Sequence, residues 1–279
     1  MRPALVAPPI YASGMVSTEE TLPLPPLDRP RQHRRRLTVL TWLMAVPFVI
    51  WAAARVFGLE SGFPTVQLIA FTPYVAVASL IPLVIAILTK RIWPAVAVAV
   101  ATIALAACVL PRWIADGDPA PGDGPSLRVM SVNRQFASGF GQAQAGVQVS
   151  GAKGLHVESV HPCAPAPTRE RDDCFVADLT AQPAATPDGP VNILIGDFNA
   201  TLDHEAFREV LAKGYRDAAD VVGAGFTASW PYDERWFIPG VTIDHVVADK
   251  RVGVRRVALH QIPGSDHKAV FAELVLPNA

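Results

Sequence analysis

The first part of the chain contains three long apolar stretches without charged residues. They cover residues 37–54, 61–89 and 92–111. Each has about 18 residues or more, enough to cross the hydrocarbon core of a bilayer at about 1.5 Å per residue. A signal peptide is the alternative for the first stretch, but that stretch begins far from the N-terminus and two more follow it. The pattern therefore predicts three transmembrane helices within residues 37–111.

Basic residues flank these stretches unevenly. Arginines occupy positions 34–36, before the first stretch, and Lys90 and Arg91 separate the second from the third. Because cytoplasmic flanks of membrane helices carry the excess of Lys and Arg, both flanks are expected in the cytoplasm. Residues 1–36, rich in Pro and small residues before the arginines, would form a disordered basic cytoplasmic tail. We therefore expect a multi-pass protein of the cell membrane, with everything after residue 111 outside.

The pattern changes again after the apolar stretches. Residues 112–125 are rich in Gly, Pro and Asp, which predicts a linker. Alternating apolar runs typical of strands follow it. Five of these runs have polar groups at or beside one end. They are 127–133 with Asn133, 155–162 with His161, 191–199 with Asp197 and Asn199, 241–247 with Asp244 and His245, and 269–275 preceded by Asp266 and His267. Because strand ends lie at the edge of a sheet, these side chains can converge on one site.

Charge limits the functions that such a site can have. The net charge of the chain is −1, and acidic residues outnumber basic ones after residue 126. A general nucleic-acid-binding protein carries a basic excess, so nucleic acid is a conceivable but not a favoured partner. An acidic surface also repels phosphate unless a bound cation reverses the local field. Phosphate chemistry at this site would therefore require a metal ion.

Three motifs make the pattern specific. Gly196-Asp197-Phe198-Asn199, Ile243-Asp244-His245 and Ser265-Asp266-His267 follow one another along the chain, each beside a predicted strand. This ordered set resembles the endonuclease/exonuclease/phosphatase family, which includes deoxyribonuclease I. The resemblance covers residues 126–279 and implies an α/β sandwich of two packed sheets. The expected fold class is thus α/β, with three N-terminal transmembrane helices before a sandwich.

The resemblance also implies catalytic roles for five residues. His267 would contact the scissile phosphate, and Asp266 would orient its imidazole. Asp197 would activate or align the attacking water. Asn199 would hold that water or a phosphate oxygen, and His161 would be a further phosphate contact.

Other residues would hold a metal ion or support the site. Asn133 and Asp266 would bind Mg²⁺, with Mn²⁺ as an alternative, because hard cations prefer oxygen ligands. Asp244 and His245 would support the site, Asp244 by holding His267 or its loop.

One part of the family pattern is missing. Members usually have a further strand before the His-Pro strand, and it ends in a metal-binding Glu. Here residues 134–154 contain no carboxylate, are too short for the missing elements and lack an apolar pattern. Glu158 is a doubtful replacement, because strand alternation places it on the opposite face from His161. We therefore expect a truncated sandwich with an exposed apolar edge.

Three smaller features remain open. An outside location would permit a disulfide between Cys163 and Cys174, and two unrelated thiols are the alternative. Asp203 is expected at the N-cap of a helix over residues 203–212. Four aromatic residues precede the Ile-Asp-His motif, namely Trp230, Tyr232, Trp236 and Phe237. They would pack in the core or a loop, or form a substrate wall or a lip at the membrane.

The sequence thus supports two main hypotheses. The first is a membrane-anchored, outward-facing, metal-dependent phosphoesterase that hydrolyses a phosphodiester or a phosphomonoester. The alternative is a catalytically inactive family member that binds a phosphate-bearing ligand or a partner. A membrane scaffold with an incidental soluble half is a third hypothesis. The expected partners are the lipid bilayer and a phosphate-ester substrate, and nothing in the sequence indicates an oligomeric state.

Overall fold

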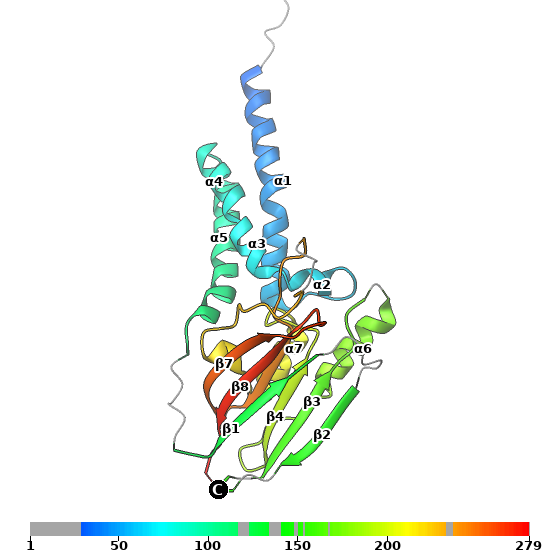
Figure 1. The fold of residues 1–279 in the computed structure, drawn as a ribbon. Coiled ribbons are helices and arrows are strands. Elements are labelled where there is room, and N and C mark those ends of the chain that lie inside the picture. The colour runs from blue at the N-terminus through cyan, green and yellow to red at the C-terminus, as the bar shows by residue number, and fades with distance from the viewer. Residues whose placement is uncertain are drawn as a thin grey trace, which may run out of the picture.

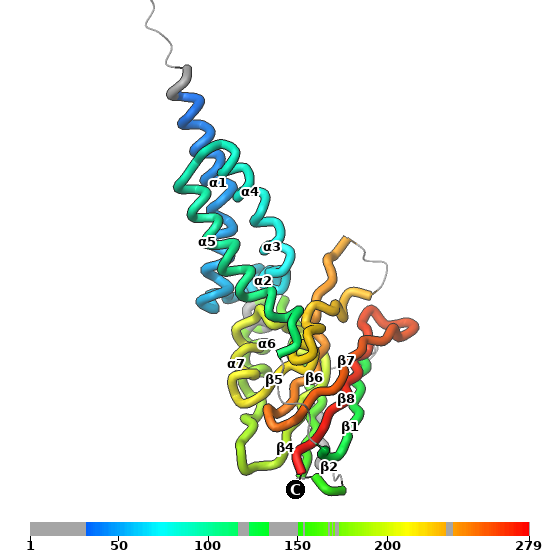
Figure 2. Tube along the Cα trace, turned by 90° about the vertical axis from the view of Figure 1, so that its left-hand side faces the viewer, coloured from blue at the N-terminus to red at the C-terminus, as the bar shows by residue number. Residues whose placement is uncertain are grey.

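The molecule has a helical part and a sandwich that stand end to end (Figure 1). The computed structural model describes residues 29–116, 123–133, 141–147, 150–152, 154–166, 168–232 and 237–278. In the helical part, α1, α4 and α5 lie side by side and project from one end of the sandwich, as both views show (Figures 1 and 2). The described C-terminal residues lie at the other end of the sandwich. The elements of the helical part are α1 (Arg29–Phe57), α2 (Thr65–Ile69), α3 (Thr72–Ala78), α4 (Leu80–Leu88), α5 (Ile92–Val109) and the 3-10 helix η1 (Leu110–Trp113).

Two helices of the described chain are long and apolar enough to cross a membrane, Gln32–Phe57 and Ile92–Trp113. The predicted middle span is divided instead into α2, α3 and α4, and its apolar helical part, Thr72–Leu88, is shorter. Pro73 and Pro82 lie in the first turns of α3 and α4, where a missing backbone N–H is tolerated. Three transmembrane helices are therefore not confirmed.

Two predicted boundaries of the helical part are wrong. Residues 29–36 belong to α1 and are not a disordered tail, whereas residues 1–28 lie outside the described ranges. The predicted linker over residues 112–125 begins inside η1, and its first residues pack on the sandwich. The ring of Trp113 lies 4.8 Å from that of Phe226, and the backbone N–H of Asp116 donates to the carbonyl of Val221. The described residues 112–116 are therefore fixed in place.

The sandwich consists of two sheets, which confirms the expected fold class for this part of the chain. Strands β3 and β4 pair in parallel, and the other neighbouring strands pair antiparallel. The first sheet has the order β1 (Ser126–Ser131), β8 (Lys268–Val275), β7 (Gly253–Gln261). The second has the order β2 (Gly141–Val147), β3 (Leu155–His161), β4 (Val191–Asp197), β6 (Asp244–Asp249), β5 (Tyr215–Asp217). The accompanying helices are α6 (Arg169–Thr180), α7 (Glu205–Ala212) and α8 (Ala218–Val221).

Strand alternation divides the buried side chains into two cores. One face of the second sheet packs on the first sheet, with Ile193 and Val246 against Ala272 and Leu274. The other face packs on α6 and α7, and its core contains Leu194, Phe175, Phe198, Phe207 and Val210. Alternate residues of β4 therefore enter different cores, as period-two alternation requires.

The segment after β1 differs from expectation. It contains β2, which pairs with β3 from Gly141↔His161 to Val147↔Leu155, although its sequence lacks an apolar pattern. Backbone hydrogen bonds of the ladder can hold a strand of small and polar residues at a sheet edge. Among the described strands, β1 pairs with β8 alone, and its Met130 is 56% exposed. Met130 lies on the outer face of this strand with Ser126 and Arg128, and the expected apolar edge stays a prediction.

A further difference concerns α7. This helix begins at Glu205 with His204 in the N-cap position, so Asp203 is not its N-cap. Asp203 is buried instead between two arginines, Arg55 at the end of α1 and Arg112 in η1. The helical part and the sandwich are thus joined by a buried ionic contact.

Candidate active site

Most of the predicted site residues lie at or beside strand ends, at the end of the sandwich that carries the helices (Figure 1). Asp197 is the last residue of β4 and pairs with Asp244, the first residue of β6. Gly196 precedes it with φ of 153°, and a Cβ at this position would lie 2.0 Å from the carbonyl oxygen of Val160 in β3. Only glycine fits there, which explains the first residue of the Gly-Asp-Phe-Asn motif.

Asn199 turns the chain after β4. Its φ of 51° lies in the left-handed region, which Asn tolerates better than most residues. Its backbone N–H donates to Oδ1 of Asp197 over 2.9 Å, and its Nδ2 donates to the carbonyl of Pro162 over 3.0 Å. Asn199 therefore orients the Asp197 carboxylate and ties the loop after β3 to the loop after β4.

His267 lies between two carboxylates. Its Nδ1 is 2.8 Å from Oδ2 of Asp244, and its Nε2 is 3.8 Å from Oδ2 of Asp197. The role expected for Asp266, orienting this imidazole, falls to Asp244, because Oδ1 of Asp266 is 3.9 Å from Nε2. The other oxygen of Asp266 accepts a hydrogen bond from the indole of Trp230 over 3.1 Å. The expected support of His267 by Asp244 is present in the structure.

Two further predicted residues approach Asp197. Nδ2 of Asn133 donates to Oδ2 of Asp197 over 2.8 Å, and Nε2 of His161 is 3.7 Å from the same oxygen. The hydroxyl of Ser265 donates to the carbonyl of Asn133 over 2.7 Å, which joins the loop before β8 to the end of β1. Groups from both sheets thus meet at one buried carboxylate.

Glu158 and His245 face the other way. Glu158 pairs with Leu194 across the parallel ladder, and Leu194 belongs to the core under α6 and α7. Because paired residues share a face, Glu158 lies on the helix-covered side and not beside Asp197. The doubtful assignment of Glu158 as a metal ligand is therefore wrong.

His245 supports the site from behind. Its Nδ1 is 2.7 Å from a carboxylate oxygen of Asp217, and its Nε2 is 2.9 Å from the carbonyl of Ala200. Both partners are acceptors, so the ring is held as an imidazolium. Its ring also packs against Phe207 at 4.5 Å. His245 fixes the loop after the Gly-Asp-Phe-Asn motif and does not enter the site.

Burial and mutual charge set the protonation of the site. Burial, and next the charge of Asp244, raise the pKa of Asp197 to about 7. Burial alone would lower the pKa of His267, but the hydrogen bond and charge of Asp244 outweigh it, so the pKa is raised. Burial, and next the charge of His267, lower the pKa of His161. The site therefore favours the charged form of the His267 imidazole, beside a carboxylate that ionises with difficulty.

This arrangement fits a divalent cation. Asp197, Asp244 and His267 each offer a ligand atom, and these atoms lie within 4.8 Å of one another. Two close buried carboxylates repel each other, and a cation between or beside them relieves that repulsion. Cys163, Cys174 and Asp178 form a second close group, but the two sulfurs are joined in a disulfide and offer no thiolate. The two carboxylates of the first group, Asp197 and Asp244, are therefore the metal candidates, since a protonated imidazole offers no lone pair.

Sequence reasoning missed one residue that organises the site. Ser229 is fully buried, and its Oγ accepts the backbone N–H groups of Ile243 and Asp244, each over 3.0 Å. It therefore fixes the start of β6, from which Asp244 reaches His267. A serine 14 and 15 residues before its two partners has no signature of its own in the sequence. Of the aromatic residues, the half-buried Trp230 bonds to Asp266, Phe237 is exposed, and Trp236 lies outside the described ranges.

Comparison with known proteins identifies the family. The model of the Endonuclease/Exonuclease/phosphatase family matches residues 71–267. The chain therefore belongs to the endonuclease/exonuclease/phosphatase family, as the three motifs indicate. The match begins within the helical part, well before the boundary at residue 126 expected from the motifs. No curated protein matches the chain.

Solved structures resemble parts of the chain. An endonuclease/exonuclease/phosphatase from Beutenbergia cavernae DSM 12333 is 16% identical, with a TM-score of 0.37, over 55% of this chain and 45% of that one. The human Nocturnin catalytic domain with bound sulfate is 14% identical, with a TM-score of 0.35, over 55% and 59%. A mannosyl-6-phosphatase from Bacteroides thetaiotaomicron is 15% identical, with a TM-score of 0.30, over 44% and 51%. The chain spans about half the length of these structures.

Proposed function

We propose that this protein is a metal-dependent phosphoesterase with its reaction centre at Asp197, Asp244 and His267. The observation that carries the proposal is the arrangement around His267, whose Nε2 faces Asp197 at 3.8 Å while Asp244 holds Nδ1 at 2.8 Å. An imidazolium oriented in this way can donate to a phosphate oxygen on which negative charge develops. Asp197 lies opposite and can align the attacking water. The substrate is a phosphodiester or a phosphomonoester.

A divalent cation completes this chemistry. We infer that Asp197 would hold Mg²⁺ or Mn²⁺, with Asn133 beside it, since Mg²⁺ keeps several waters and needs only one or two carboxylates. The ion would supply positive charge to the phosphate. Asp266, expected as a ligand, is turned toward Trp230 by its hydrogen bond, so we give it a supporting role. His161, beside Asp197, remains a proposed phosphate contact.

Membrane anchoring and an outward-facing sandwich are part of the same proposal. The candidate spans Gln32–Phe57 and Ile92–Trp113 support anchoring. The disulfide Cys163–Cys174 supports an outside location, because disulfides persist in oxidising compartments. The basic flanks of the apolar stretches favour the same orientation. The orientation can be tested in intact cells with a membrane-impermeant maleimide and two variants, one with a Cys introduced in α2 and one with a Cys at the α4–α5 turn. Only the Cys in α2 should react.

The first test is hydrolysis of bis-p-nitrophenyl phosphate and p-nitrophenyl phosphate by the full chain in detergent. We expect turnover with Mg²⁺ or Mn²⁺, none with EDTA, and a loss of about 10²-fold or more for Asp197→Asn, as for removal of a group that acts in the transition state. Turnover that survives both EDTA and the substitution would show that the activity arises elsewhere.

A second candidate function is supported by one observation. The carboxylates that meet at the described site come from β4, β6 and the loop before β8, while Glu158 of β3 faces the helices. An inactive family member that binds a phosphate-bearing ligand or a partner would have this incomplete set. Calorimetric titration with inorganic phosphate in the presence of Mg²⁺ distinguishes the two. Binding without turnover of either ester would favour the inactive binder.

A further inference from the structure

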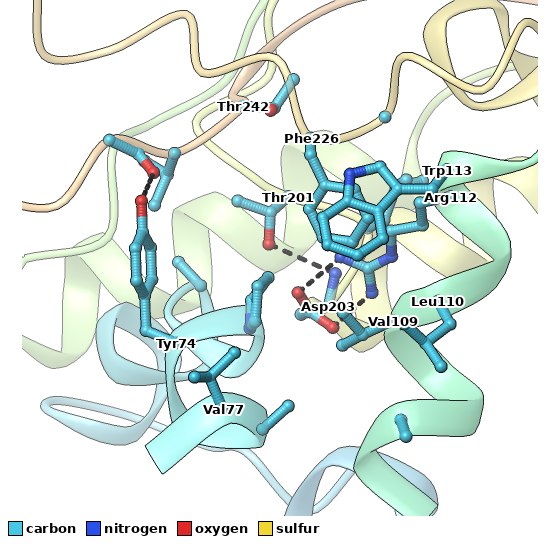
Figure 3. Close-up of a pocket in the computed structure, with 18 of the residues that line it drawn as sticks. Tyr74, Val77, Val109, Leu110, Arg112, Trp113, Thr201, Asp203, Phe226 and Thr242 are labelled. Atoms are coloured by element: carbon cyan, nitrogen blue, oxygen red, sulfur yellow. Dashed lines mark hydrogen bonds and ion pairs between the residues drawn. The ribbon is translucent and has the colours of Figure 1, made fainter.

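A cavity of about 420 Å³ lies where the helical part meets the sandwich (Figure 3). It falls within the usual size of small-molecule pockets, about 300–1,000 Å³. Its walls come from both parts, and Figure 3 shows Tyr74 and Val77 of α3 on one side and Trp113 and Phe226 on the other. Leu110 of η1 and Val241 of the sandwich also line it. Most of this lining is apolar.

The mouth of the cavity opens on the surface of the helices. Val77 is 68% exposed, Leu110 50% and Trp113 64%, and all three line the cavity. Leu110 and Trp113 belong to the candidate span Ile92–Trp113, at the end nearest the sandwich. Large apolar side chains gathered at an exposed mouth are unfavourable in water but suit the edge of a hydrocarbon layer. The mouth therefore faces lipid if this helix spans the membrane.

The polar groups at the base of the cavity are already satisfied. Nη1 and Nη2 of Arg112 donate to the two oxygens of Asp203 over 2.8 and 2.5 Å. The hydroxyl of Tyr74 donates to the carbonyl of Gly240 over 2.7 Å. An ionic or strongly hydrogen-bonding ligand would have to break these contacts. The cavity is therefore suited to an apolar chain and not to a phosphate group.

The sandwich wall of the cavity lies a few residues along the chain from the reaction centre. Val241 and Thr242 line the cavity, and the chain reaches Asp244 two residues later. Val241 pairs with Trp230, whose indole donates to Asp266. After β4, Thr201 lines the cavity four residues beyond Asp197. One amphiphile could therefore place an apolar chain in the cavity and a head group near the site.

We propose that this cavity binds one acyl chain of a membrane phospholipid, and that the phosphate ester cleaved at the site belongs to such a lipid. The inference rests on the proposed phosphoesterase function and on the membrane anchor. A water-soluble phosphate ester has no apolar part to fill the cavity. A helix of a partner protein, about 10–12 Å wide with its side chains, is too broad for a cavity of this volume.

The test measures occupancy of the cavity without requiring activity. The full chain is placed in phosphatidylcholine nanodiscs that contain a phosphatidylcholine with a photoreactive diazirine on one acyl chain. After illumination, labelled peptides are identified by mass spectrometry. Because any lipid labels the outer faces of the helices, the informative label is on the sandwich residues of the wall, Phe226 and 240–242. We expect label there.

Two neighbouring residues of α5 provide matched variants. Ala106 lines the cavity, whereas Ala107 is exposed and does not. Ala106→Phe fills the cavity and should abolish label on the wall, while Ala107→Phe should retain it. Val77→Trp is a second filling variant at an exposed position, in case Ala106→Phe does not fold. Unchanged label in both folded filling variants, or no wall label in the unaltered protein, would overturn the inference.

Hydrolysis by the unaltered protein separates this inference from the proposed function. Turnover of bis-p-nitrophenyl phosphate without wall label would retain the phosphoesterase and reject the acyl-chain site. In a second outcome, the wall is labelled, the filling variants abolish this label, and no ester is hydrolysed. That outcome would retain the acyl-chain site but reject the phosphoesterase activity, and with it a lipid as the substrate. Wall label together with hydrolysis of lipid phosphate that Ala106→Phe impairs and Ala107→Phe does not would support the whole inference.

Discussion

The carboxylate of Asp244 lies 2.8 Å from Nδ1 of His267 and joins the first residue of β6 to the loop before β8. Ser229 holds the backbone of Asp244 in place, so the imidazole is positioned by a buried chain of contacts. The other ring nitrogen is thereby aimed at Asp197. The first prediction concerns the pair Asp244 and His267.

Asp244→Asn should lower kcat by about 10²–10⁴-fold, because Asn cannot stabilise the imidazolium and favours the wrong tautomer. Asp249→Asn is the matched control, since Asp249 is the buried acid at the other end of β6 and pairs with Arg251. It should change stability and leave kcat within a small factor. Equal losses of kcat in the two folded variants would show that Asp244 acts only through the fold.

Metal binding should stabilise the fold through Asp197. A cation present at a free concentration 100 times its Kd adds about 2.7 kcal/mol to the free energy of unfolding. We expect Mg²⁺ or Mn²⁺ to raise the melting temperature of the unaltered protein and to leave that of Asp197→Asn unchanged. The measurement is intrinsic tryptophan fluorescence during heating, with EDTA as the reference. A similar rise in the variant would place the metal at another site.

Asp203 should be essential for the junction between helices and sandwich. Its carboxylate is fully buried and contacts Nε of Arg55 at 2.6 Å and Nη2 of Arg112 at 2.5 Å. Asp203→Asn leaves two buried guanidinium groups without their counter-charge and should reduce the free energy of unfolding by about 3–5 kcal/mol. Glu205→Gln, two residues away and 43% exposed, should change it by less than about 1 kcal/mol. Chemical denaturation in detergent measures both, and equal effects would contradict the importance of the buried contact.

The disulfide between Cys163 and Cys174 should stabilise the loop that follows His161. It ties this loop to α6, with Cα atoms 5.8 Å apart, and the N–H of Cys163 donates to Asp178. Replacing both cysteines by Ser should cost about 2–4 kcal/mol of unfolding free energy. Cys108→Ala, which removes the free cysteine of α5, is the control. A reductant should destabilise the unaltered protein and Cys108→Ala alike, and have no effect on the double variant.

His204 should make the fold sensitive to mild acid. Burial lowers its pKa to about 4, and its Nδ1 accepts the N–H of Thr201 over 2.9 Å, which requires an unprotonated nitrogen. Between the unfolded pKa near 6.5 and about 4, the unfolded chain therefore binds more protons than the folded one. Stability should fall as pH decreases through this window, by up to about 1.4 kcal/mol per unit from this group.

The control for this effect is His204→Asn, whose amide oxygen can accept the same N–H. Unfolding free energies are compared at pH 7.5 and pH 5.5 for both proteins. The unaltered protein should lose more stability between these values than the variant. An identical loss in both would assign the acid sensitivity to other groups.

The strands that carry the site were predictable from the sequence, because their alternating apolar positions are buried on one or both faces. The expected runs at 155–162, 191–199 and 269–275 correspond to β3, β4 and β8. The polar groups at their ends come together because β3 and β4 are parallel neighbours and β6 runs antiparallel beside β4. Family motifs and strand periodicity were sufficient for this part.

Other features depend on contacts that local patterns do not contain. Strand β2 has no apolar pattern and is held by its backbone pairing with β3. The exchange of roles between Asp244 and Asp266 depends on Trp230, which is 36 residues from the carboxylate it binds. Asp203 contacts Arg55, which is 148 positions away in the sequence. Its position before a predicted helix suggested an N-cap and gave no sign of this ionic contact. Such pairings follow from tertiary packing, which overrides local preference.

The most direct test of the central claim compares two histidines of the same strand-rich domain. The measurement is kcat/KM for bis-p-nitrophenyl phosphate with Mg²⁺ or Mn²⁺, for the unaltered protein, His267→Ala and His156→Ala. His156 is exposed on β3, near the end opposite His161. The account predicts a metal-dependent activity that falls about 10²-fold or more in His267→Ala and is retained in His156→Ala. Full activity in His267→Ala, or no activity in the folded unaltered protein with either metal, would contradict it.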